Sequence, residues 1–333
     1  MRAAYIESHG DASVITIGEV PTPKPGPGEL LVRVGAAAIN PIDLYRRSGR
    51  VAMPMSFPYV IGTDVAGTVE AVGPQVTRFQ PGDRVWGSNQ GILGRQGSVS
   101  EYVCTDEQWL YSTPPKLSDS EAASMALVGI TAHLGLFDRG HLKPHETVYV
   151  SGGGGGVGSM VIQMAKATGA RVATSAGHEP TLELCRSLGA DLVLNYKTDD
   201  VPARLLEWSE EGIDIWFETQ REPDLMMIVP LLRKRGRAIL MAGRDATPTF
   251  PLGLFYPRNC SILGFAMFNY DPDEQLTCAE DINRWVSQDR LRPIVGRTFP
   301  LEQAAEAEQF LEDNTIGGAG TLVGKVVIMI NPA

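Results

Sequence analysis

A run of five glycines followed by Val157 and Gly158 constrains the fold more than any other feature of this chain. The β-branched segment Val148–Val150 precedes it, and apolar residues spaced three and four apart follow it. Gly153, Gly155 and Gly158 therefore fit the pattern G-x-G-x-x-G between a predicted strand and a predicted helix. A flexible linker is the alternative, but linkers are not normally bracketed by an apolar strand and an amphipathic helix.

Such a turn favours a dinucleotide because each glycine has a separate task. The first permits a tight turn, the second lets the backbone approach a pyrophosphate, and the third lets helix and strand pack closely. The helix N-terminus then offers free N–H groups and a positive dipole end to the phosphates. The residues expected to contact the phosphates are Gly153, Gly155, Gly156, Val157 and Gly158.

The pattern of the chain changes near residue 123. Residues 1–122 read as short alternating strands split by turn residues, and 123–265 alternate between strands and helices. The second pattern predicts an α/β fold with a doubly wound parallel sheet, and we expect 266–333 to return to the first domain. The strands expected in the second domain are 148–151, 171–175, 193–195, 213–217 and 238–241, with helices at 158–168, 181–188 and 225–233.

The net charge and the cysteine content argue against a nucleic-acid-binding protein and against a disulfide-bonded one. The net charge is −10, and the short cluster Arg233–Arg235 is expected near a helix end, so a nucleic-acid partner is not expected. The four cysteines form no C-x-x-C pair, which is typical of reduced thiols. Neither a membrane-spanning run nor an apolar leader in Met1–Gly10 is evident, so we expect a cytoplasmic protein with no membrane partner.

Several motifs in a fixed order carry a family resemblance. The chain resembles the zinc-free quinone oxidoreductase (ζ-crystallin-like) branch of the medium-chain dehydrogenase/reductase superfamily over nearly its whole length. The resemblance implies a GroES-like β-rich catalytic domain, 1–122 and 266–333, beside a Rossmann domain, 123–265. The matching stretches are Asn40–Gly49, Gly62–Gly67, Pro81–Val85, Gly129–Ala132, the glycine-rich turn, Leu188–Asp191 with Asn195 and Tyr196, and Gly324–Val327.

The departures from the zinc-dependent relatives are equally informative. Those relatives carry zinc-ligating cysteine, histidine and cysteine residues where this chain has Asn40, Thr63 and, nearby, Leu127. None of the three replacements is an ordinary zinc ligand. The cysteines of the family's structural zinc lobe are missing from Gly87–Ser100 as well. We therefore expect no zinc.

The expected cofactor is NADPH. An NAD-binding fold usually places a carboxylate at the end of the second strand, where this chain has Ala176. The lysine that often follows in relatives is replaced by Thr181, and Glu179 could reach a ribose hydroxyl, so NADH remains the less favoured alternative. Residues that could replace the missing lysine are Ser175, His178, Tyr196, Lys197 and Lys325. Thr219 and Gly243 follow two further predicted strands, where the crevice of a doubly wound sheet lies.

The expected reaction is hydride transfer to a conjugated acceptor. Without zinc a simple ketone lacks a strong Lewis acid, whereas a quinone or an enone accepts hydride more readily. The candidate donors to the developing oxyanion are Asn40, Tyr45 and Thr131, of which the first two match family positions near nicotinamide and substrate. Their alternatives are a turn cap for Asn40 and core packing for Tyr45. A double-bond reductase that handles quinones poorly, or a nucleotide-binding protein with little catalysis, are the rival functions.

Four further expectations concern side chains and assembly. Asp43 is expected to be structural, as a cap for a segment beginning at Leu44. Arg47 and Asp64 are expected to pair either with the cofactor or with each other. The resemblance implies a homodimer, and Ile262–Phe268 is the candidate interface strand, with a buried strand within the chain as its alternative.

Overall fold

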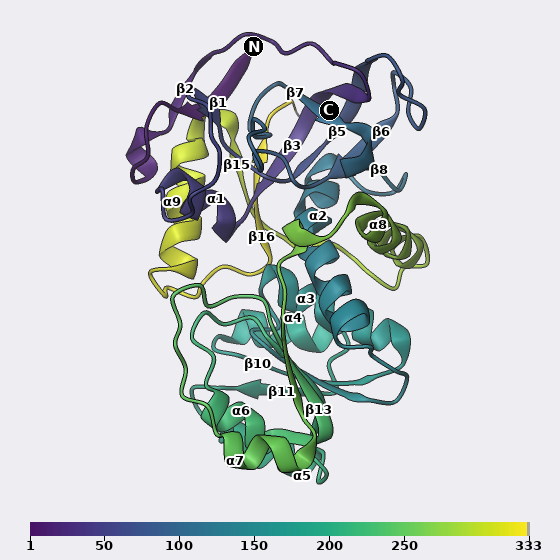
Figure 1. Cartoon of the computed structure of the whole chain (residues 1–333), viewed down its shortest axis with the longest axis vertical. Coiled ribbons are helices and arrows are strands. Elements are labelled where there is room, and N and C mark those ends of the chain that lie inside the picture. The colour runs from purple at the N-terminus through teal and green to yellow at the C-terminus, as the bar shows by residue number, and fades with distance from the viewer. Residues whose placement is uncertain (332–333) are drawn as a thin grey trace. The chain divides into compact units, whose positions relative to one another are not determined.

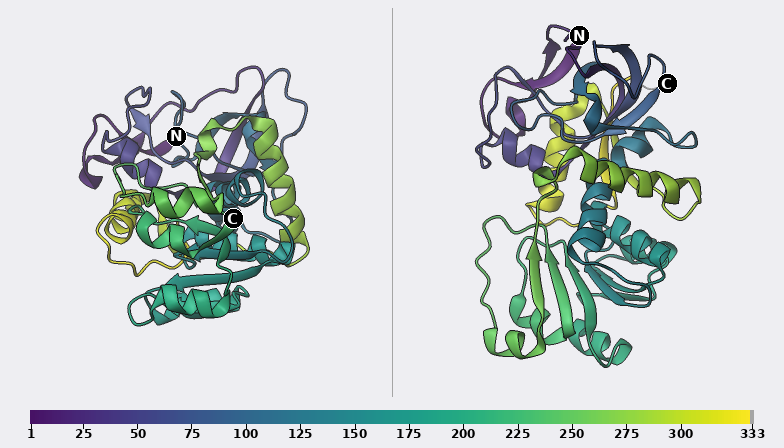
Figure 2. Two further views of the ribbon diagram at one scale, coloured as in Figure 1. Left: turned by 60° about the horizontal axis from the view of Figure 1, so that its bottom comes forward. Right: turned by 45° about the vertical axis from the view of Figure 1, so that its right-hand side comes forward.

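The computed structural model describes residues 1–331, and their backbone forms two compact units (Figures 1 and 2). The first, called here the β-rich unit, comprises Met1–Leu127, Asp271–Ser287 and the C-terminal segment from Pro293. The second, the parallel-sheet unit, comprises Val128–Tyr270 and Gln288–Arg292. Each unit is described by itself below.

The β-rich unit is built on one sheet of seven strands and one of three. In the larger sheet the strand order is β15-β16-β3-β5-β6-β8, with β7 also paired to β3, and the smaller sheet has the order β2-β1-β4. Most neighbours are antiparallel, so strands alternate between a core face and an outer face. The strands are β1 (Arg2–Ile6), β2 (Thr16–Glu19), β3 (Glu29–Ile39), β4 (Tyr59–Val60), β5 (Val65–Val72), β6 (Arg84–Gly87), β7 (Tyr102–Asp106), β8 (Leu110–Ser112), β15 (Val295–Pro300) and β16 (Lys325–Met329).

Two helices of this unit position the residues discussed below. Helix α1 (Pro41–Arg47) begins directly after β3, because a proline suits the first helical position, where no N–H partner is needed. Helix α9 (Ala304–Thr315) packs against α1, and its apolar face joins a core of β1, β3 and β16 residues. Helix α8 (Pro272–Ser287) is amphipathic, with Ile282 and Trp285 on its buried face.

The parallel-sheet unit is a six-stranded sheet in the order β11-β10-β9-β12-β13-β14 with every pair parallel. Figure 2 shows its long strands running side by side with helices on either side. This confirms the expected α/β fold of a GroES-like β-rich domain and a doubly wound domain. Its strands are β9 (Thr147–Ser151), β10 (Arg171–Ala176), β11 (Leu192–Asn195), β12 (Ile213–Glu218), β13 (Leu232–Leu240) and β14 (Ser261–Gly264).

The helices of this unit follow its strands in the alternating order expected from the sequence. Residues of α5 and α6 form one core with Tyr149 and Trp216, which point to one face of the sheet. Thr174 points to the opposite face, toward α3 and α4, as its nearness to Ile162 and Cys185 around Gly153 shows. The helices are α3 (Gly156–Thr168), α4 (Glu179–Ser187), α5 (Val201–Trp208), α6 (Leu225–Leu231) and the single turn α7 (Leu252–Phe255).

Two expected elements differ in extent from the sequence prediction. The helix expected over 225–233 ends at Leu231, one residue after Pro230, and Arg233–Arg235 belong to strand β13. Proline disfavours continuation of a helix, and the chain here returns to the sheet. The strand expected over 262–268 ends at Gly264, and a 3-10 turn occupies Met267–Asn269.

Helix α2 (Asp119–His133) continues as a π-helical segment, Leu134–Arg139. Among the described residues, this run of 21 is long and apolar enough to cross a membrane by length and composition. In its most apolar window 78% of residues are buried within the structure, as in the core helix of a globular protein. All four cysteines are free thiols.

Candidate active site

The glycine-rich turn joins the end of β9 to the start of α3. Gly152 has a φ of +71°, a conformation that favours glycine, and Gly155 is the N-cap of the helix. A Cβ atom on Gly158 would lie 2.3 Å from the carbonyl oxygen of Gly152, and one on Gly153 would lie 2.1 Å from Thr174 Oγ1. These positions therefore accept no side chain, and the turn presents bare backbone and a helix N-terminus at the carboxyl edge of the sheet.

A buried carboxylate fixes the neighbouring strand ends. Glu218, at the end of β12, accepts hydrogen bonds from Ser151 Oγ, from Trp216 Nε1 (3.0 Å) and from the backbone N–H of Gln220 (2.7 Å). The predicted site residue Thr219 follows it, and its hydroxyl donates to the Ser151 carbonyl at 2.6 Å. Sequence reasoning missed the role of Ser151 and Glu218, which lock the ends of β9 and β12 together.

The end of β10 carries no carboxylate. Ala176 is its last residue, as expected, and the side chain of Ser175 turns into the sheet, where its Oγ lies 2.7 Å from the hydroxyl of Tyr149. Glu179, which could have reached a ribose, pairs with Arg186 at 2.8 Å. The last position of β10 therefore lacks the carboxylate that usually binds a ribose 2′-OH and repels a 2′-phosphate.

Two basic side chains meet beside this strand end. His178 Nε2 lies 3.2 Å from Lys197 Nζ, and both side chains belong to exposed surface loops. Tyr196, which is 56% exposed, packs over Gly177, where a Cβ would lie 2.4 Å from the tyrosine hydroxyl. His178, Tyr196 and Lys197 thus converge from the ends of β10 and β11. Gly243 follows β13 with a φ of +94°.

The predicted residue Asn40 is the centre of a buried network in the β-rich unit. Its amide Nδ2 donates to Asp64 Oδ2 at 2.9 Å, and its Oδ1 accepts a hydrogen bond from Lys325 Nζ. Lys325 also donates to the Ile39 carbonyl at 2.7 Å and lies 3.7 Å from Asp64. Lys325, predicted to contact the cofactor, therefore has a full set of partners within this unit.

Burial dominates the electrostatics of this network. Burial raises the pKa of Asp64 to about 6, although the positive charge of Lys325 and the hydrogen bond from the Asn40 amide both lower that pKa. Burial likewise lowers the pKa of Lys325, which the carboxylate of Asp64 opposes. Charged groups persist inside only when paired and hydrogen-bonded, so the three side chains depend on one another.

A second buried cluster holds the start of α1. Asp43 Oδ2 accepts the backbone N–H of Asn40 at 2.8 Å, and Asp43 Oδ1 accepts the Thr63 hydroxyl at 2.5 Å. Arg46 lies 3.7 Å from the same carboxylate. Asp43 has the structural, capping role expected of it, but the expected start at Leu44 is wrong: the helix begins at Pro41, and Asp43 closes a capping box with Asn40 from the first turn.

Arg47 and Asp64 do not pair with each other. Arg47 binds two carboxylates of α9, Glu308 at 2.8 Å and Glu312 at 2.5 Å, whereas Asp64 binds Asn40 and Lys325. Burial raises the pKa of Glu308 to about 8. Arg47 therefore fastens α1 to α9 inside the β-rich unit.

The residues at the family's zinc-ligand positions do not fit a zinc ion. Asn40 and Thr63 are engaged as described, and the backbone N–H of Leu127 donates to Asp64 Oδ1 at 3.1 Å. An amide, a hydroxyl and an aliphatic side chain are not typical zinc ligands, and the ammonium of Lys325 donates a hydrogen bond to the amide oxygen of Asn40. Among residues 1–331, no group of three His, Cys, Asp or Glu is arranged to hold a metal.

The other two predicted catalytic residues keep free hydroxyls. Tyr45 lies on α1 and is half-buried, with Arg50 over its ring. Thr131 lies on α2 and is 4% exposed. Neither hydroxyl makes a hydrogen bond within the described part of the chain, so both can donate to a ligand. They belong to different units and are considered separately.

Comparison with known proteins identifies the family. Residues 26–115 match the alcohol dehydrogenase GroES-like domain and 156–283 match the zinc-binding dehydrogenase domain. The quinone oxidoreductase of Homo sapiens is 30% identical over 99% of this chain and 98% of its own length.

Solved structures agree with this assignment. An NAD-dependent alcohol dehydrogenase is 32% identical with a TM-score of 0.89, and each chain is 99% covered. The mycobacterial protein Rv1454c, solved in complex with NADPH, is 29% identical with a TM-score of 0.86, again with 99% of each chain covered. The chain belongs to the quinone oxidoreductase branch of the medium-chain dehydrogenase/reductase superfamily and is an oxidoreductase.

Proposed function

We propose that this protein is an NADPH-dependent, zinc-independent reductase of quinones or other conjugated carbonyl compounds. The observation that carries the cofactor assignment is the end of β10, where Ala176 replaces a carboxylate and His178 and Lys197 meet. A 2′-phosphate would bind there through charge-assisted hydrogen bonds, with Tyr196 beside the adenosine end. The NADPH complex of Rv1454c supports the cofactor assignment, and the human relative named quinone oxidoreductase supports a quinone as the acceptor.

In this proposal the cofactor supplies a hydride from nicotinamide C4. The chain binds the pyrophosphate through the backbone of the glycine-rich turn and the N-terminus of α3. A conjugated acceptor then gains negative charge on its oxygen, and the free hydroxyls of Tyr45 and of Thr131, each taken within its own unit, are the alternative donors proposed to stabilise it. Asp64 and Lys325 hold the amide of Asn40 in place, and the second N–H of that amide is a further candidate donor. We further propose that Lys325 does not bind the cofactor.

The zinc-independent part rests on the donor set around Asn40. At the positions of the missing ligands, Asn40 is hydrogen-bonded to Asp64 and Thr63 to Asp43, and no Lewis acid is needed for an acceptor that is already conjugated. A homodimer is also proposed. Within residues 1–331, strand β14 is an edge strand paired only with β13, and the exposed apolar residues Leu252, Leu254 and Tyr256 precede it.

The test is oxidation of the reduced cofactor followed at 340 nm with 1,4-benzoquinone, 9,10-phenanthrenequinone and a simple enone. NADPH and NADH are compared in parallel, for the wild type and for a Lys197→Ala variant. We expect a preference for NADPH, and a KM for NADPH that rises roughly tenfold in the variant, with NADH little affected. Thr198→Ala, a neighbouring change without loss of charge, is the matched control.

The alternatives predict different results. Turnover of the enone alone would move the assignment to double-bond reduction. Equal use of NADH and NADPH, with no effect of Lys197→Ala, would refute the phosphate site. Tight NADPH binding without turnover of any acceptor would favour a nucleotide-binding protein.

A further inference from the structure

A second, basic groove lies at the opposite edge of the parallel sheet from the glycine-rich turn. It measures about 860 Å³ and lies where β9, β12 and β13 begin, whereas the dinucleotide turn lies where β9 ends. A pocket of this size is in the range that binds small molecules. Its lining is His141, Lys143, Glu146, Glu211, Asp214, Arg233, Lys234, Arg235, Arg237 and Arg258.

The charges of this groove do not balance. The three acidic side chains form ion pairs with two arginines. Arg233 pairs with Glu211 and with Asp214, and Arg237 pairs with Glu146 at 2.8 Å. A third arginine, Arg258, donates to backbone carbonyls at the end of α6 and the start of β13, such as that of Pro230 at 2.8 Å.

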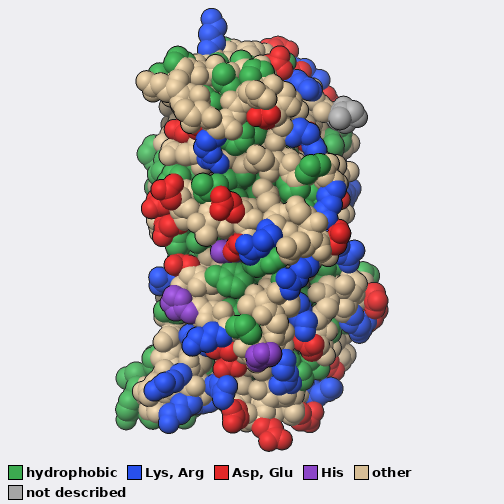
Figure 3. All heavy atoms as spheres, turned by 90° about the vertical axis from the view of Figure 1, so that its right-hand side faces the viewer, with side chains coloured by type: hydrophobic (Ala, Val, Ile, Leu, Met, Phe, Trp, Pro, Cys, Tyr) green, Lys and Arg blue, Asp and Glu red, His purple; other side chains and the backbone are tan. Residues whose placement is uncertain are grey.

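Three cationic side chains of the groove have neither an acidic partner nor a carbonyl partner within the described residues. The side chains of Lys143, Lys234 and Arg235 are exposed and make no hydrogen bond or ion pair within the described residues. They come from two separate segments, the loop before β9 and the start of β13, and His141 lines the groove beside them. In a chain of net charge −10, this is a local excess of positive charge. Figure 3 shows many Lys and Arg side chains, with Asp and Glu side chains among them, on one face of the molecule.

The backbone explains why these cations project from the sheet. In the pairing of β12 with β13, Ile213 lies opposite Leu232 and Ile215 lies opposite Arg237, so the segment between them on β13 bulges out. Arg235 adopts a φ of +66°, a conformation that is costly for a residue with a side chain. The bulge places Lys234 and Arg235 at the rim instead of in the ladder.

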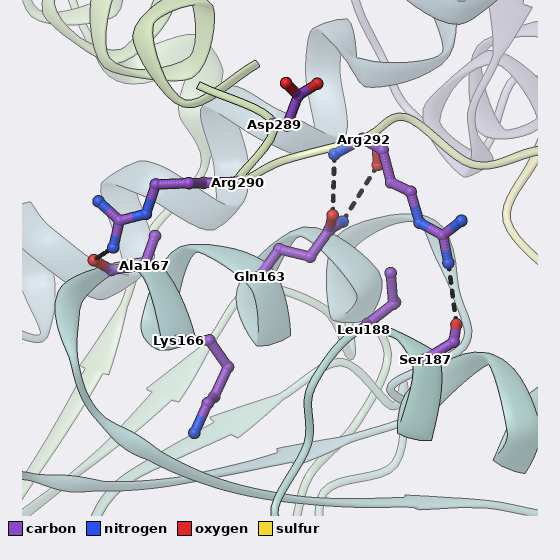
Figure 4. A pocket seen from close by; sticks show the side chains of 8 residues that line it. All are labelled: Gln163, Lys166, Ala167, Ser187, Leu188, Asp289, Arg290 and Arg292. Atoms are coloured by element: carbon purple, nitrogen blue, oxygen red, sulfur yellow. Dashed lines mark hydrogen bonds between the residues drawn. The ribbon is translucent and has the colours of Figure 1, made fainter. Parts of the chain in front are cut away.

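A smaller cavity nearby shows what basic residues look like when they serve only the fold. It measures about 290 Å³, and Figure 4 shows its two arginines bound to helix C-termini. Arg290 donates to the carbonyl of Ala167 near the end of α3, and Arg292 donates to Ser187 at the end of α4 at 2.9 Å. Cations at those ends stabilise the helices. Lys143, Lys234 and Arg235 have no such structural partner.

From this contrast we infer that the basic groove is a second anion-binding site that takes a chain of phosphate groups, separate from the dinucleotide site. Adjacent phosphates carry several negative charges that can engage the ammonium groups of Lys143 and Lys234 and the planar guanidinium of Arg235 together. Free polyphosphate and the triphosphate of a nucleotide share this chemistry.

The test is calorimetric titration of the full-length protein with inorganic tripolyphosphate, with and without saturating NADPH. The groove variant Lys143→Gln/Lys234→Gln/Arg235→Gln is compared with a control of equal net charge, Lys24→Gln/Arg204→Gln/Arg284→Gln, which removes cations elsewhere on the surface. We expect tripolyphosphate to bind the wild type and the control alike, and the groove variant roughly tenfold or more weakly. Binding should weaken between about 50 mM and about 200 mM salt.

Two results would overturn the inference. Equal binding by the groove variant and the control would show diffuse surface charge only, and loss of binding with NADPH present would place the anion at the dinucleotide turn. Titration with ATP separates the two sources of the ligand: equal affinity indicates recognition of the phosphate chain alone, and tighter binding adds a contact to the nucleoside. If the triple variant does not fold, Lys143→Gln alone, on the other segment, should still weaken binding severalfold.

Discussion

Glu308 makes the β-rich unit sensitive to pH through the contact between α9 and α1. Its carboxylate lies 2.8 Å from Arg47 Nε, and both side chains are fully buried. Burial raises the pKa of Glu308 from 4.5 to about 8, with Arg47 acting in the opposite direction. A raised carboxyl pKa means that the folded protein holds the proton more tightly than the unfolded chain. The contribution of Glu308 to the free energy of unfolding is therefore fully present below pH 4.5. It is lost as the pH rises to about 8, and no more is lost above that pH.

The substitution Glu308→Gln isolates this effect, because glutamine imitates the protonated form at every pH. The pKa difference corresponds to about 5 kcal/mol, as an upper bound, at about 1.4 kcal/mol for each unit. We expect the melting temperature of Glu308→Gln to rise relative to the wild type between pH 5 and 8.

The assay is thermal unfolding followed by circular dichroism across that range. Glu312→Gln is the matched control, since Glu312 binds the same arginine but is 29% exposed. Parallel pH profiles for the wild type and Glu308→Gln would refute the reasoning.

Three further changes test the candidate site. Gly158→Ala would place a Cβ 2.3 Å from the Gly152 carbonyl oxygen, so NADPH affinity measured by fluorescence titration should fall at least roughly tenfold, whereas Gly253→Ala, with open space around it, should not change it. Tyr45→Phe should lower kcat roughly tenfold to a hundredfold while NADPH binding stays the same, and an unchanged kcat would remove Tyr45 from the chemistry. Lys325→Met leaves Asp64 buried without its cation, and we expect a loss of about 3–5 kcal/mol in unfolding free energy; Lys24→Met, at an exposed position, should cost almost nothing.

The parts of the fold that the sequence predicted well are those set by neighbouring residues. Strand β9, the glycine-rich turn and helix α3 follow from a β-branched run, a glycine pattern and a helical period, all within about two dozen positions. Ala176 also lies at the end of β10 as predicted. By contrast, the end of α6 and the start of β13 depend on where the chain rejoins a parallel sheet. That choice is made by pairing with β12, so the local pattern extended the helix too far.

In the candidate site, too, local patterns in the sequence predicted some features, and the features set by long-range contacts were missed. The sequence identified Thr219 from its place after a strand, but the hydrogen bonds that hold it come from Ser151, 68 positions earlier. The bulge at Arg235 also depends on long-range pairing, here of β13 with β12. From the local sequence alone, the cluster Arg233–Arg235 looks like the cation-rich end of a helix. Long-range pairing places these groups, and a single sequence does not reveal it.

Asn40 forms hydrogen bonds with residues that its sequence motif does not contain. Family resemblance places an asparagine near nicotinamide and substrate, which made Asn40 a candidate donor to the oxyanion. In the folded chain Lys325, 285 positions away, donates to its carbonyl oxygen, and Asp64 accepts from its nitrogen. The amide nitrogen has a second N–H, whose contact within the described residues is the Ala38 carbonyl at 3.5 Å, the outer limit of a hydrogen bond. The network therefore fixes the orientation of the Asn40 amide at the start of α1, and it leaves Asn40 a candidate donor beside the free hydroxyl of Tyr45 on the same helix.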